Sequence, residues 1–499
     1  MSDRGRARVH TATLLGTQAV PVSVEVDVGA GLPSFIVVGL GDTAVLESRD
    51  RVRAALRSRG YSFPSARVVV NLAPAPLRKH GTGFDLPIAA AILAATGQVP
   101  ARAVDGHLVG ELSLSGAVRP VPGVLAHALA ARNASRRLLI APESAATAAV
   151  VSGLAVEAVP SLDALSGPAA SSGMSPPPSP HVVGDLDAGP DLADVAGHDI
   201  AKRALEIAAA GGHNVLFVGP PGSGKTMLAS RLGALLPPLD GPERLEVAVV
   251  HDIAGLDPSP ALAGIRPYRA PHHSCSIAGL VGGGTPLRPG EISLSHTGVL
   301  FLDELPEFGP AALQALRQPL EDGSISLVRA EGRIQFPARF ALIASANPCP
   351  CGYYGDPTHP CECTAMQVRR YHTRIGGPLM DRIDIRLRVD RIDPGLLVHA
   401  PRAESSAVVR ARVLAARERA TAARRCPSAV LRGATLLDAC RLDADARERL
   451  TAQARVLNLS GRSITRLLRV ARTIADLEAL DRVTTGVLDE AIGYRGSET

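Results

Sequence analysis

The pattern of apolar and polar positions predicts an alternation of strands and helices over roughly the first 165 residues. Short β-branched runs separated by turn residues are typical of strands, and apolar spacing of three and four residues is typical of helices. The predicted strands cover 21–28, 35–40 and 66–73, and the predicted helices, each closing on glycine, cover 47–60 and 84–97. The pattern predicts an α+β domain over residues 1–165.

The pattern changes twice further along the chain. Residues 166–190 are rich in Ser, Pro and Gly, which predicts a linker. Over 191–392 strands again alternate with helices, as in a parallel-sheet nucleotide-binding domain. Residues 393–499 are almost wholly helical in pattern. One apolar stripe in this last part is formed by Ile464, Leu467, Leu468, Ala471, Ile474 and Leu477. The chain is therefore expected to be a multidomain α/β protein with an all-α C-terminal domain.

Composition limits the cellular setting. With 46% hydrophobic and 20% charged residues among 499, the chain can bury several cores. The basic N-terminus lacks a signal-peptide apolar region, and the apolar stretch 87–97 is too short to span a bilayer. We expect a cytoplasmic protein with no membrane partner, whose reduced cysteines bind metal or lie buried. The net charge of +5 comes almost wholly from arginine, as GC-rich codon usage would produce, so it is weak evidence for nucleic-acid binding.

A phosphate-binding motif, GPPGSGKT at 219–226, follows the apolar run 214–218 and precedes the helical run 227–236. Glycines let backbone N–H groups turn toward phosphates at a helix N-terminus. We expect the lysine to reach the β- and γ-phosphates of ATP and the threonine to bind Mg²⁺. The predicted nucleotide-binding residues are Gly219, Pro220, Pro221, Gly222, Ser223, Gly224, Lys225 and Thr226.

Two later apolar strands end in polar side chains. GVLFLDELPEF (298–308) places Asp303 beside the expected Mg²⁺ and Glu304 where a general base would activate water. Alone, this segment could equally be a strand that ends in an acidic turn, but the upstream motif favours catalysis. FALIASAN (340–347) ends in Asn347, which is expected to hold the attacking water against the γ-phosphate.

Residues 191–490 resemble the magnesium-chelatase-like branch of AAA+ ATPases, and the resemblance extends over nearly the full length to ComM-type members. It is carried by RPYRAPHHSCS, GLVGGG, PGEISLSHTGVLFLDELPEF, LRQPLEDG, ANPCPCGYYGD and GPLMDRIDI, which lie between residues 266 and 385. The resemblance implies that Arg382 is an arginine finger acting on the neighbouring subunit, and hence a homo-hexameric ring. The alternative for Arg382 is a surface ion pair with Asp381 or Asp384. Arg462 resembles the family's lid arginine that contacts nucleotide, with Arg466 as a competing candidate.

The N-terminal segments 78–92 and 110–131 resemble the proteolytic domain of Lon-type proteases. That family needs a serine and a lysine, but the matching positions here read Gly81-Thr82-Gly83 and Val124 to His127. Thr82 with Lys79 or His80 is a conceivable substitute. We expect the fold without proteolysis, used as a structural or DNA-facing collar.

Four of the chain's seven cysteines lie in one Pro- and Gly-rich loop: Cys349, Cys351, Cys361 and Cys363. Their C-x-C-x9-C-x-C spacing predicts a structural Zn²⁺ site, with His359 or His372 as a substitute ligand. The alternatives are free thiols or a redox pair. A metal-fixed loop here could transmit the ATP state to a neighbouring subunit or to a bound strand. Cys275, Cys426 and Cys440 are isolated and expected to be ordinary side chains.

Two insertions carry candidate DNA contacts. The first, 266–291, contains Arg266 and Arg269, and the second, a predicted hairpin at 324–337, contains Arg329 and Arg333. In related ring motors such elements face the central pore, where arginines contact phosphates without reading sequence. The alternative is a solvated charged turn. With 3% aromatic residues, base stacking is an unpromising mode of binding.

The motifs predict an ATP-hydrolysing motor, and the resemblance to ComM-type members implies a hexamer that acts on DNA as a helicase or branch-migration factor during recombination of incoming DNA. The alternative is a magnesium-chelatase motor subunit, which would drive metal insertion with partner proteins. The Lon-like N-terminal domain and the cysteine insertion count against that alternative. A third class, an ATP-dependent protease, lacks its Ser–Lys pair.

Overall fold

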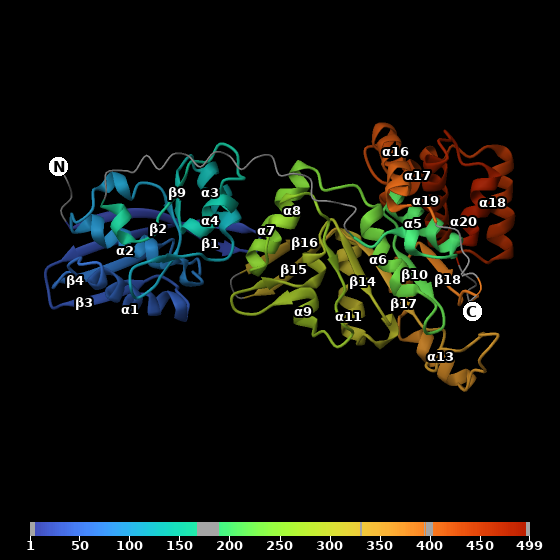
Figure 1. Ribbon diagram of the computed structural model, residues 1–499, viewed down its shortest axis with the longest axis horizontal. Coiled ribbons are helices and arrows are strands. Elements are labelled where there is room, and N and C mark those ends of the chain that lie inside the picture. Colours follow the sequence, from blue (N-terminus) through green and yellow to red (C-terminus); the bar gives the residue numbers. More distant parts are fainter. Residues whose placement is uncertain (1–4, 167–188, 330–331, 394, 396–402, 496–499) are drawn as a thin grey trace.

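The computed structural model describes residues 5–166, 189–329, 332–393, 395 and 403–495. Three parts follow one another along the long axis of the molecule (Figure 1). N-terminal strands lie at one end, a second sheet lies in the middle, and C-terminal helices lie at the other end. The predicted linker 166–190 falls almost wholly on 167–188, outside the described residues.

The N-terminal sheet has seven strands in the order β3-β4-β2-β1-β5-β8-β9. Strands β1, β2 and β4 pair antiparallel, and the remaining pairs are parallel. The strands are β1 (Arg6–Leu15), β2 (Gln18–Gly29), β3 (Ser34–Val38), β4 (Arg67–Ala73), β5 (His107–Leu108), β8 (Leu138–Ile140) and β9 (Val156–Ala158). A separate hairpin joins β6 (Glu111–Leu112) to β7 (Val118–Arg119).

Four helices belong to this part: α1 (Thr43–Ser58), α2 (Asp85–Ala95), α3 (Val124–Asn133) and α4 (Pro142–Ala148). Helix α2 is apolar on every side because it is the central core element, with ten of its eleven residues buried. The predicted strands and helices of the first 165 residues are thereby confirmed, with boundary shifts of a few residues.

The middle sheet has five parallel strands in the order β11-β14-β17-β10-β18. They are β11 (Tyr268–Arg269), β14 (Val299–Leu302), β17 (Ala341–Ala346), β10 (Val215–Val218) and β18 (Ile385–Arg388). Strands β10, β14 and β17 read as continuous apolar runs because helices cover both faces of the sheet. One face packs on α5 (Asp199–Gly211), α6 (Lys225–Leu235) and the C-terminal helices.

The other face and the surrounding loops carry short helices. These are α7 (Gly241–Ala254), α8 (Ser259–Leu262), α9 (Ile277–Val281), α10 (Glu291–Leu294), α11 (Pro310–Ala315), α12 (Arg317–Asp322), α13 (Ala365–Thr373) and α14 (Gly377–Met380). Two hairpins extend from this part: β12 (Gly282–Gly283) with β13 (Arg288–Pro289), and β15 (Ser324–Arg329) with β16 (Gly332–Pro337). The second confirms the predicted hairpin; residues 330 and 331 at its turn lie outside the described residues.

The C-terminal part is helical, as predicted. It contains α16 (Ser406–Arg424), α17 (Gly433–Cys440), α18 (Ala444–Val456), α19 (Gly461–Leu477) and α20 (Thr485–Gly493). The predicted apolar stripe of α19 faces inward, since Leu467, Leu468, Ala471 and Ile474 are at most 2% exposed. This stripe joins the C-terminal helices and the middle sheet into one core.

The N-terminal and middle parts share a smaller core, in which apolar side chains of α3 pack against those of α7. Asp252, on α7, accepts hydrogen bonds from the backbone N–H groups of Gly123 (3.2 Å) and Leu125 (2.7 Å) at the start of α3. It therefore caps a helix of the other part. Burial raises the pKa of Asp252 to about 6, against these hydrogen bonds, which lower it.

The mixed α/β class, the parallel-sheet core and the helical C-terminal region are confirmed. The Lon likeness of the N-terminal part and the domain boundaries stay predictions. Among the described residues, no helix combines the length and apolar character needed to cross a membrane.

Candidate active site and metal centre

The polar residues predicted to bind ATP gather at one edge of the middle sheet. Strand β17 pairs in parallel with both β10 and β14, so the carboxyl ends of these strands lie side by side. The phosphate loop (219–226) follows β10, Asp303 and Glu304 follow β14, and Asn347 follows β17. In open parallel sheets, ligands bind in the crevice at this edge.

Local backbone geometry explains two glycines of the phosphate loop. Gly224, which precedes α6, has φ +87°, a left-handed conformation that side chains disfavour. A Cβ on Gly219 would lie 2.0 Å from the carbonyl oxygen of Val389, so only glycine fits there. The loop is therefore shaped by contact with the chain that follows β18.

Lys225 contacts the phosphate loop from within. Its Nζ donates to the carbonyl oxygens of Gly219 (2.7 Å) and Pro220 (2.9 Å) and to Asn347 Oδ1 at 3.3 Å. Burial lowers the pKa of Lys225. The contact with Asn347 joins the ammonium group to the predicted sensor of the γ-phosphate.

Thr226 and Asp303 lie in direct contact, since the threonine hydroxyl donates to Asp303 Oδ2 at 2.9 Å. Hydroxyl and carboxylate oxygens are ligands that Mg²⁺ prefers, so this pair fits the ion. A residue that the sequence did not reveal orients the carboxylate: the Ser345 hydroxyl donates to Asp303 Oδ1 and accepts from the Glu304 N–H at 3.1 Å. No signal in the sequence of β17 distinguishes this serine from an ordinary strand residue.

Glu304 has an unusual backbone conformation, with φ +52° and ψ +48°. A non-glycine residue in the left-handed region is uncommon and concentrates at functional sites. Its side chain is half exposed, and its Oε2 lies 3.6 Å from His273 Nδ1. The carboxylate therefore stands free of the sheet, next to the insertion 266–291.

Arg382 lies at the opposite edge of the sheet. It precedes β18, and Ile385 at the start of β18 pairs with Val215 at the start of β10, whereas the phosphate loop follows the end of β10. Four residues of strand span about 13 Å. The guanidinium of Arg382 is bound to Glu321 and to the Pro378 carbonyl. Arg382 thus forms an ion pair, the kind of contact that the alternative proposed, but within the described structure its partner is Glu321 and neither Asp381 nor Asp384.

The two lid candidates differ in exposure. Arg466 is 9% exposed and donates to the carbonyls of Met380 (2.8 Å) and Ile383 (3.1 Å), so it holds the chain together. The Arg462 side chain is 81% exposed and donates to Asp381 Oδ2 at 3.2 Å. Arg462 is the more exposed of the two, and its contact with Asp381 places it beside Arg382. Its role as the lid arginine stays a prediction.

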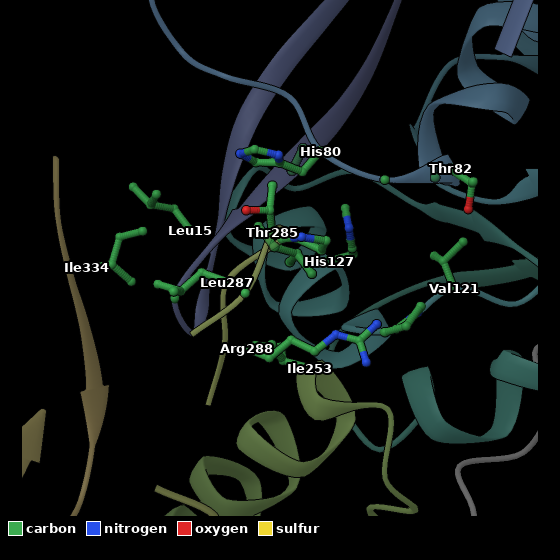
Figure 2. A pocket seen from close by; sticks show the side chains of 18 of the residues that line it. Leu15, His80, Thr82, Val121, His127, Ile253, Thr285, Leu287, Arg288 and Ile334 are labelled. Atoms are coloured by element: carbon green, nitrogen blue, oxygen red, sulfur yellow. The ribbon is translucent and has the colours of Figure 1, made fainter. Parts of the chain in front are cut away.

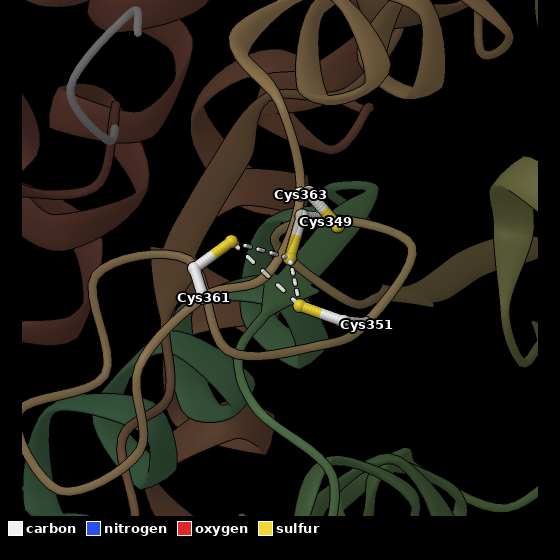
Figure 3. A group of neighbouring side chains, drawn as sticks. All are labelled: Cys349, Cys351, Cys361 and Cys363. Carbon is white, nitrogen blue, oxygen red and sulfur yellow. Dashed lines mark hydrogen bonds between the residues drawn. The ribbon is translucent and has the colours of Figure 1, made fainter.

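The four predicted zinc ligands converge (Figure 3). Their Sγ atoms all lie within 4.8 Å of one another, and three of the separations are 3.3, 3.6 and 3.7 Å. A tetrahedral Zn²⁺ with Zn–S bonds of about 2.3 Å needs sulfur separations of about 3.8 Å. The group comprises Cys349, Cys351, Cys361 and Cys363. Cys349 is fully buried, and a hydrogen bond from the Tyr353 backbone lowers the pKa of Cys351 to about 6.

Neither histidine named as a substitute ligand points at the sulfurs. His372 Nε2 is hydrogen-bonded to the Pro348 carbonyl oxygen at 2.7 Å, and His359 Nδ1 contacts Thr358 and Arg391. The donor set of this group consists of four cysteines.

The predicted DNA-contacting arginines fall into two classes. Arg266 is a structural residue: it donates to the carbonyls of Pro237 (2.5 Å) and Thr297 (2.5 Å) and to Glu243 at 2.7 Å. Arg269 forms a two-pronged ion pair with Glu291 at 2.6 and 2.7 Å. The geometry gives DNA contact by these two residues no support.

Arg329 and Arg333 lie exposed on the β15–β16 hairpin. Arg333 donates to the Ser326 hydroxyl on the paired strand, while Arg329 is one of the residues that line a cavity between the hairpin and the N-terminal part. Contact of these two with DNA stays a prediction.

That cavity, of about 720 Å³, brings together residues far apart in the sequence (Figure 2). His80, Thr82 and His127 line it from the N-terminal part, and Thr285 and Arg288 reach it from the β12–β13 hairpin. The lining mixes cationic and apolar groups. It lies where the Lon resemblance would place a proteolytic centre.

The cavity contains no arrangement for covalent proteolysis among the described residues. Buried Lys79 donates to the Pro74 carbonyl, and His80 lies 3.5 Å from Asp42. His127 is hydrogen-bonded to His107 at 3.0 Å, and burial lowers its pKa to about 4. No described hydrogen bond joins Thr82 to any of these bases, so the substitute pair finds no support in the geometry.

Comparison with known families covers almost the whole chain. Three family models match: "Magnesium chelatase, subunit ChlI" over residues 191–396, "Subunit ChlI of Mg-chelatase" over 24–145, and "Magnesium chelatase, subunit ChlI C-terminal" over 403–495. The first contains the phosphate loop, both strand-end carboxylates and the cysteine group.

Similar proteins extend over the full length. The uncharacterized protein YifB of Salmonella typhimurium is 45% identical over 98% of this chain and 97% of its own. The competence protein ComM of Haemophilus influenzae is 43% identical over the same shares. The magnesium-chelatase 67 kDa subunit of Heliobacterium mobile is 28% identical over 36% of this chain and 30% of its own. The chain therefore belongs to the magnesium-chelatase-like family of AAA+ ATPases that includes the competence protein ComM.

Proposed function

We propose that this protein is an ATP-hydrolysing ring motor that acts on DNA without sequence preference, as a ComM-like helicase or branch-migration factor. The observation that supports a ring motor is that the residues expected to hydrolyse ATP are divided between the two edges of one sheet. The phosphate loop, Asp303, Glu304 and Asn347 lie at one edge, while Arg382 lies at the other.

Each residue at the carboxyl edge has a role that its geometry supports. Lys225 would exchange its carbonyl contacts for the β- and γ-phosphates, and the Thr226–Asp303 pair would hold Mg²⁺. The ion neutralises charge that develops on the phosphates. Glu304 would orient and deprotonate the attacking water, and Asn347 would sense the γ-phosphate.

Arg382 cannot serve its own phosphate loop across the sheet, so we assign it to the site of a neighbouring subunit. A fixed guanidinium stabilises the charge that forms during phosphoryl transfer. Arg462 lies beside it through Asp381 and would act at the same junction. A head-to-tail contact that supplies each site with a neighbour's arginine is satisfied for every subunit in a closed ring, which we propose to be a homo-hexamer.

The DNA assignment rests on the full-length similarity to ComM and on the exposed arginines Arg329, Arg333 and Arg288. All three belong to hairpins that extend from the middle part. Guanidinium groups on such hairpins suit contact with a phosphate backbone.

A chelatase motor subunit is the second candidate, favoured because all three matching family models describe the magnesium-chelatase subunit ChlI. One of these matches residues 24–145, so the N-terminal part does not separate the two functions. The chelatase subunit of Heliobacterium mobile, however, is similar over only 36% of this chain, whereas ComM is similar over 98%.

The deciding experiment is steady-state ATPase activity with and without single-stranded and four-way-junction DNA, with Glu304→Gln as the blank. Stimulation by DNA that the variant lacks supports the DNA motor. Hydrolysis that Glu304→Gln abolishes but DNA does not change refutes the DNA role and favours the chelatase function. Casein degradation, tested in parallel, would instead indicate a protease.

A further inference from the structure

The cysteine loop (349–363) touches the phosphate loop of its own subunit. A Cβ placed on Gly352 would lie 2.6 Å from Pro221 Cδ, so the Gly352 backbone packs against the Pro221 ring without room for a side chain. Gly352 also has φ +88°, which disfavours any other residue. The position of the cysteine loop therefore constrains Pro221, in the middle of the phosphate loop.

Arg391 joins the same two loops with one guanidinium. Its Nε and Nη2 donate to the Pro221 carbonyl oxygen at 3.3 and 3.2 Å, and its Nη1 contacts His359 Nδ1 at 3.0 Å. The guanidinium also lies 5.6 Å from the ring centre of Tyr353. Both Tyr353 and His359 belong to the cysteine loop, so Arg391 couples that loop to a phosphate-loop carbonyl.

The contact with Pro221 bears on how phosphate is bound. A trans peptide is planar, with its C=O and N–H pointing in opposite directions. Holding the Pro221 carbonyl toward Arg391 turns the N–H of Gly222 away from Arg391. Backbone N–H groups facing inward are what a phosphate loop needs to cradle its ligand.

The cysteine loop has little of its own to hold it in place. It is rich in Pro and Gly, and its described residues contain neither a helix nor a strand. Its buried groups are few: Cys349, and the Asp356 carboxylate, which accepts the N–H groups of Thr358 and His359. The four Sγ atoms lie within 4.8 Å of one another, close enough for one tetrahedral Zn²⁺, and such an ion would supply the missing cross-link.

We infer that a single Zn²⁺ bound by Cys349, Cys351, Cys361 and Cys363 sets the shape of the phosphate loop in the same subunit and thereby the affinity for ATP. This inference rests on the nucleotide-binding part of the proposed function and is independent of DNA. Arg391 is the positioning residue that carries the effect. Loss of the metal frees the cysteine loop to move, and Arg391 then no longer holds the Pro221 carbonyl in place.

The test combines metal analysis with ATP binding on the full-length chain. Mass spectrometry of the purified protein is expected to find one zinc per chain, which a chelator removes. Binding of a fluorescent ATP analogue, without DNA, is then expected to weaken about tenfold, and added Zn²⁺ is expected to restore it. Cys361→Ser should behave like the stripped protein, while Cys426→Ser, an isolated cysteine, should behave like wild type.

Arg391→Ala separates the coupling from the metal, because it leaves all four cysteines in place. It is expected to retain zinc and yet bind ATP about tenfold more weakly. Arg449→Ala, which removes an exposed ion pair with Asp489 on the C-terminal helices, is the matched control and should change neither. Absence of zinc from the wild-type chain would overturn the inference. The inference would also be overturned if the chain contains zinc but neither its removal nor Arg391→Ala changes the affinity for ATP.

These experiments distinguish a failure of the zinc coupling from a failure of the proposed DNA function. Unchanged ATP affinity on zinc removal refutes the coupling whatever DNA does. An ATPase that ignores DNA refutes the DNA motor and leaves the zinc coupling intact.

Discussion

Replacing Arg266 with alanine should destabilise the middle part of the molecule instead of weakening DNA binding selectively. The guanidinium satisfies the carbonyls of Pro237 and Thr297 and the carboxylate of Glu243, all through charge-assisted hydrogen bonds. The side chain of Arg266 is only 9% exposed, while that of Glu243 is 28% exposed. The substitution leaves the two carbonyl oxygens and the Glu243 carboxylate without these donors, in surroundings from which water is largely excluded.

The size of the effect follows from this geometry. Removing one partner of a buried ion pair costs about 3–5 kcal/mol, and the partial exposure of Glu243 favours the lower end. For a cooperative unit of about 150–250 residues, each kcal/mol lowers Tm by about 2–4 °C. We therefore expect Arg266→Ala to lower the Tm of the affected transition by roughly 6–12 °C, measured by circular dichroism.

The matched control is Arg333→Ala, whose side chain is exposed and bonded only to Ser326 among the described residues. It should change stability by no more than about 0.5 kcal/mol. If Arg333 contacts DNA, this variant should instead weaken binding to single-stranded DNA and reduce its salt dependence. The reasoning is refuted if Arg266→Ala melts within about 2 °C of wild type and loses DNA binding alone.

Three further outcomes can be measured. Ser345→Ala removes the hydroxyl that orients Asp303, so kcat for ATP should fall roughly 10–100-fold with ATP binding retained; an unchanged kcat would exclude this role. Arg382→Ala should lose hydrolysis by about 10³-fold or more, and mixing it with equally inactive Lys225→Ala should restore part of the activity if the arginine acts across subunits. Burial raises the pKa of Asp252 to about 6, so ionising this carboxyl costs more free energy in the folded protein than in the unfolded chain. This loss of stability is absent below about pH 3.8 and complete above about pH 6. Tm should therefore fall between about pH 4 and 6, less steeply in Asp252→Asn; identical slopes would contradict the assignment.

The part of the site that follows apolar strands could be predicted from the sequence. The phosphate loop, Asp303 and Asn347 each stand directly after a run of buried β-branched or apolar residues, and parallel strands place such positions at one edge. The cysteine group was equally predictable because its four members lie close together in the chain. Local patterns were sufficient in both cases.

Other features depend on information that a linear pattern does not carry. Ser345 acts only because the register of β14 against β17 brings it to Asp303. The location of Arg382 depends on β18 lying next to β10, a matter of strand order. Arg266 resembled a DNA contact because charge patterns do not reveal burial, and its carbonyl partners lie about thirty residues away.

The core shared by α3 and α7 affects how this protein could be divided in the laboratory or exchanged in evolution. A cut within 166–190 would leave the apolar side chains of α7 uncovered and strip α3 of the carboxylate at its first turn. Fragments made there should aggregate when expressed singly and reassociate when produced together. Moving the N-terminal part onto another ATPase motor would require α7 to be moved with it. A segment that could be exchanged as one folding unit therefore extends beyond residues 166–190 and includes α7.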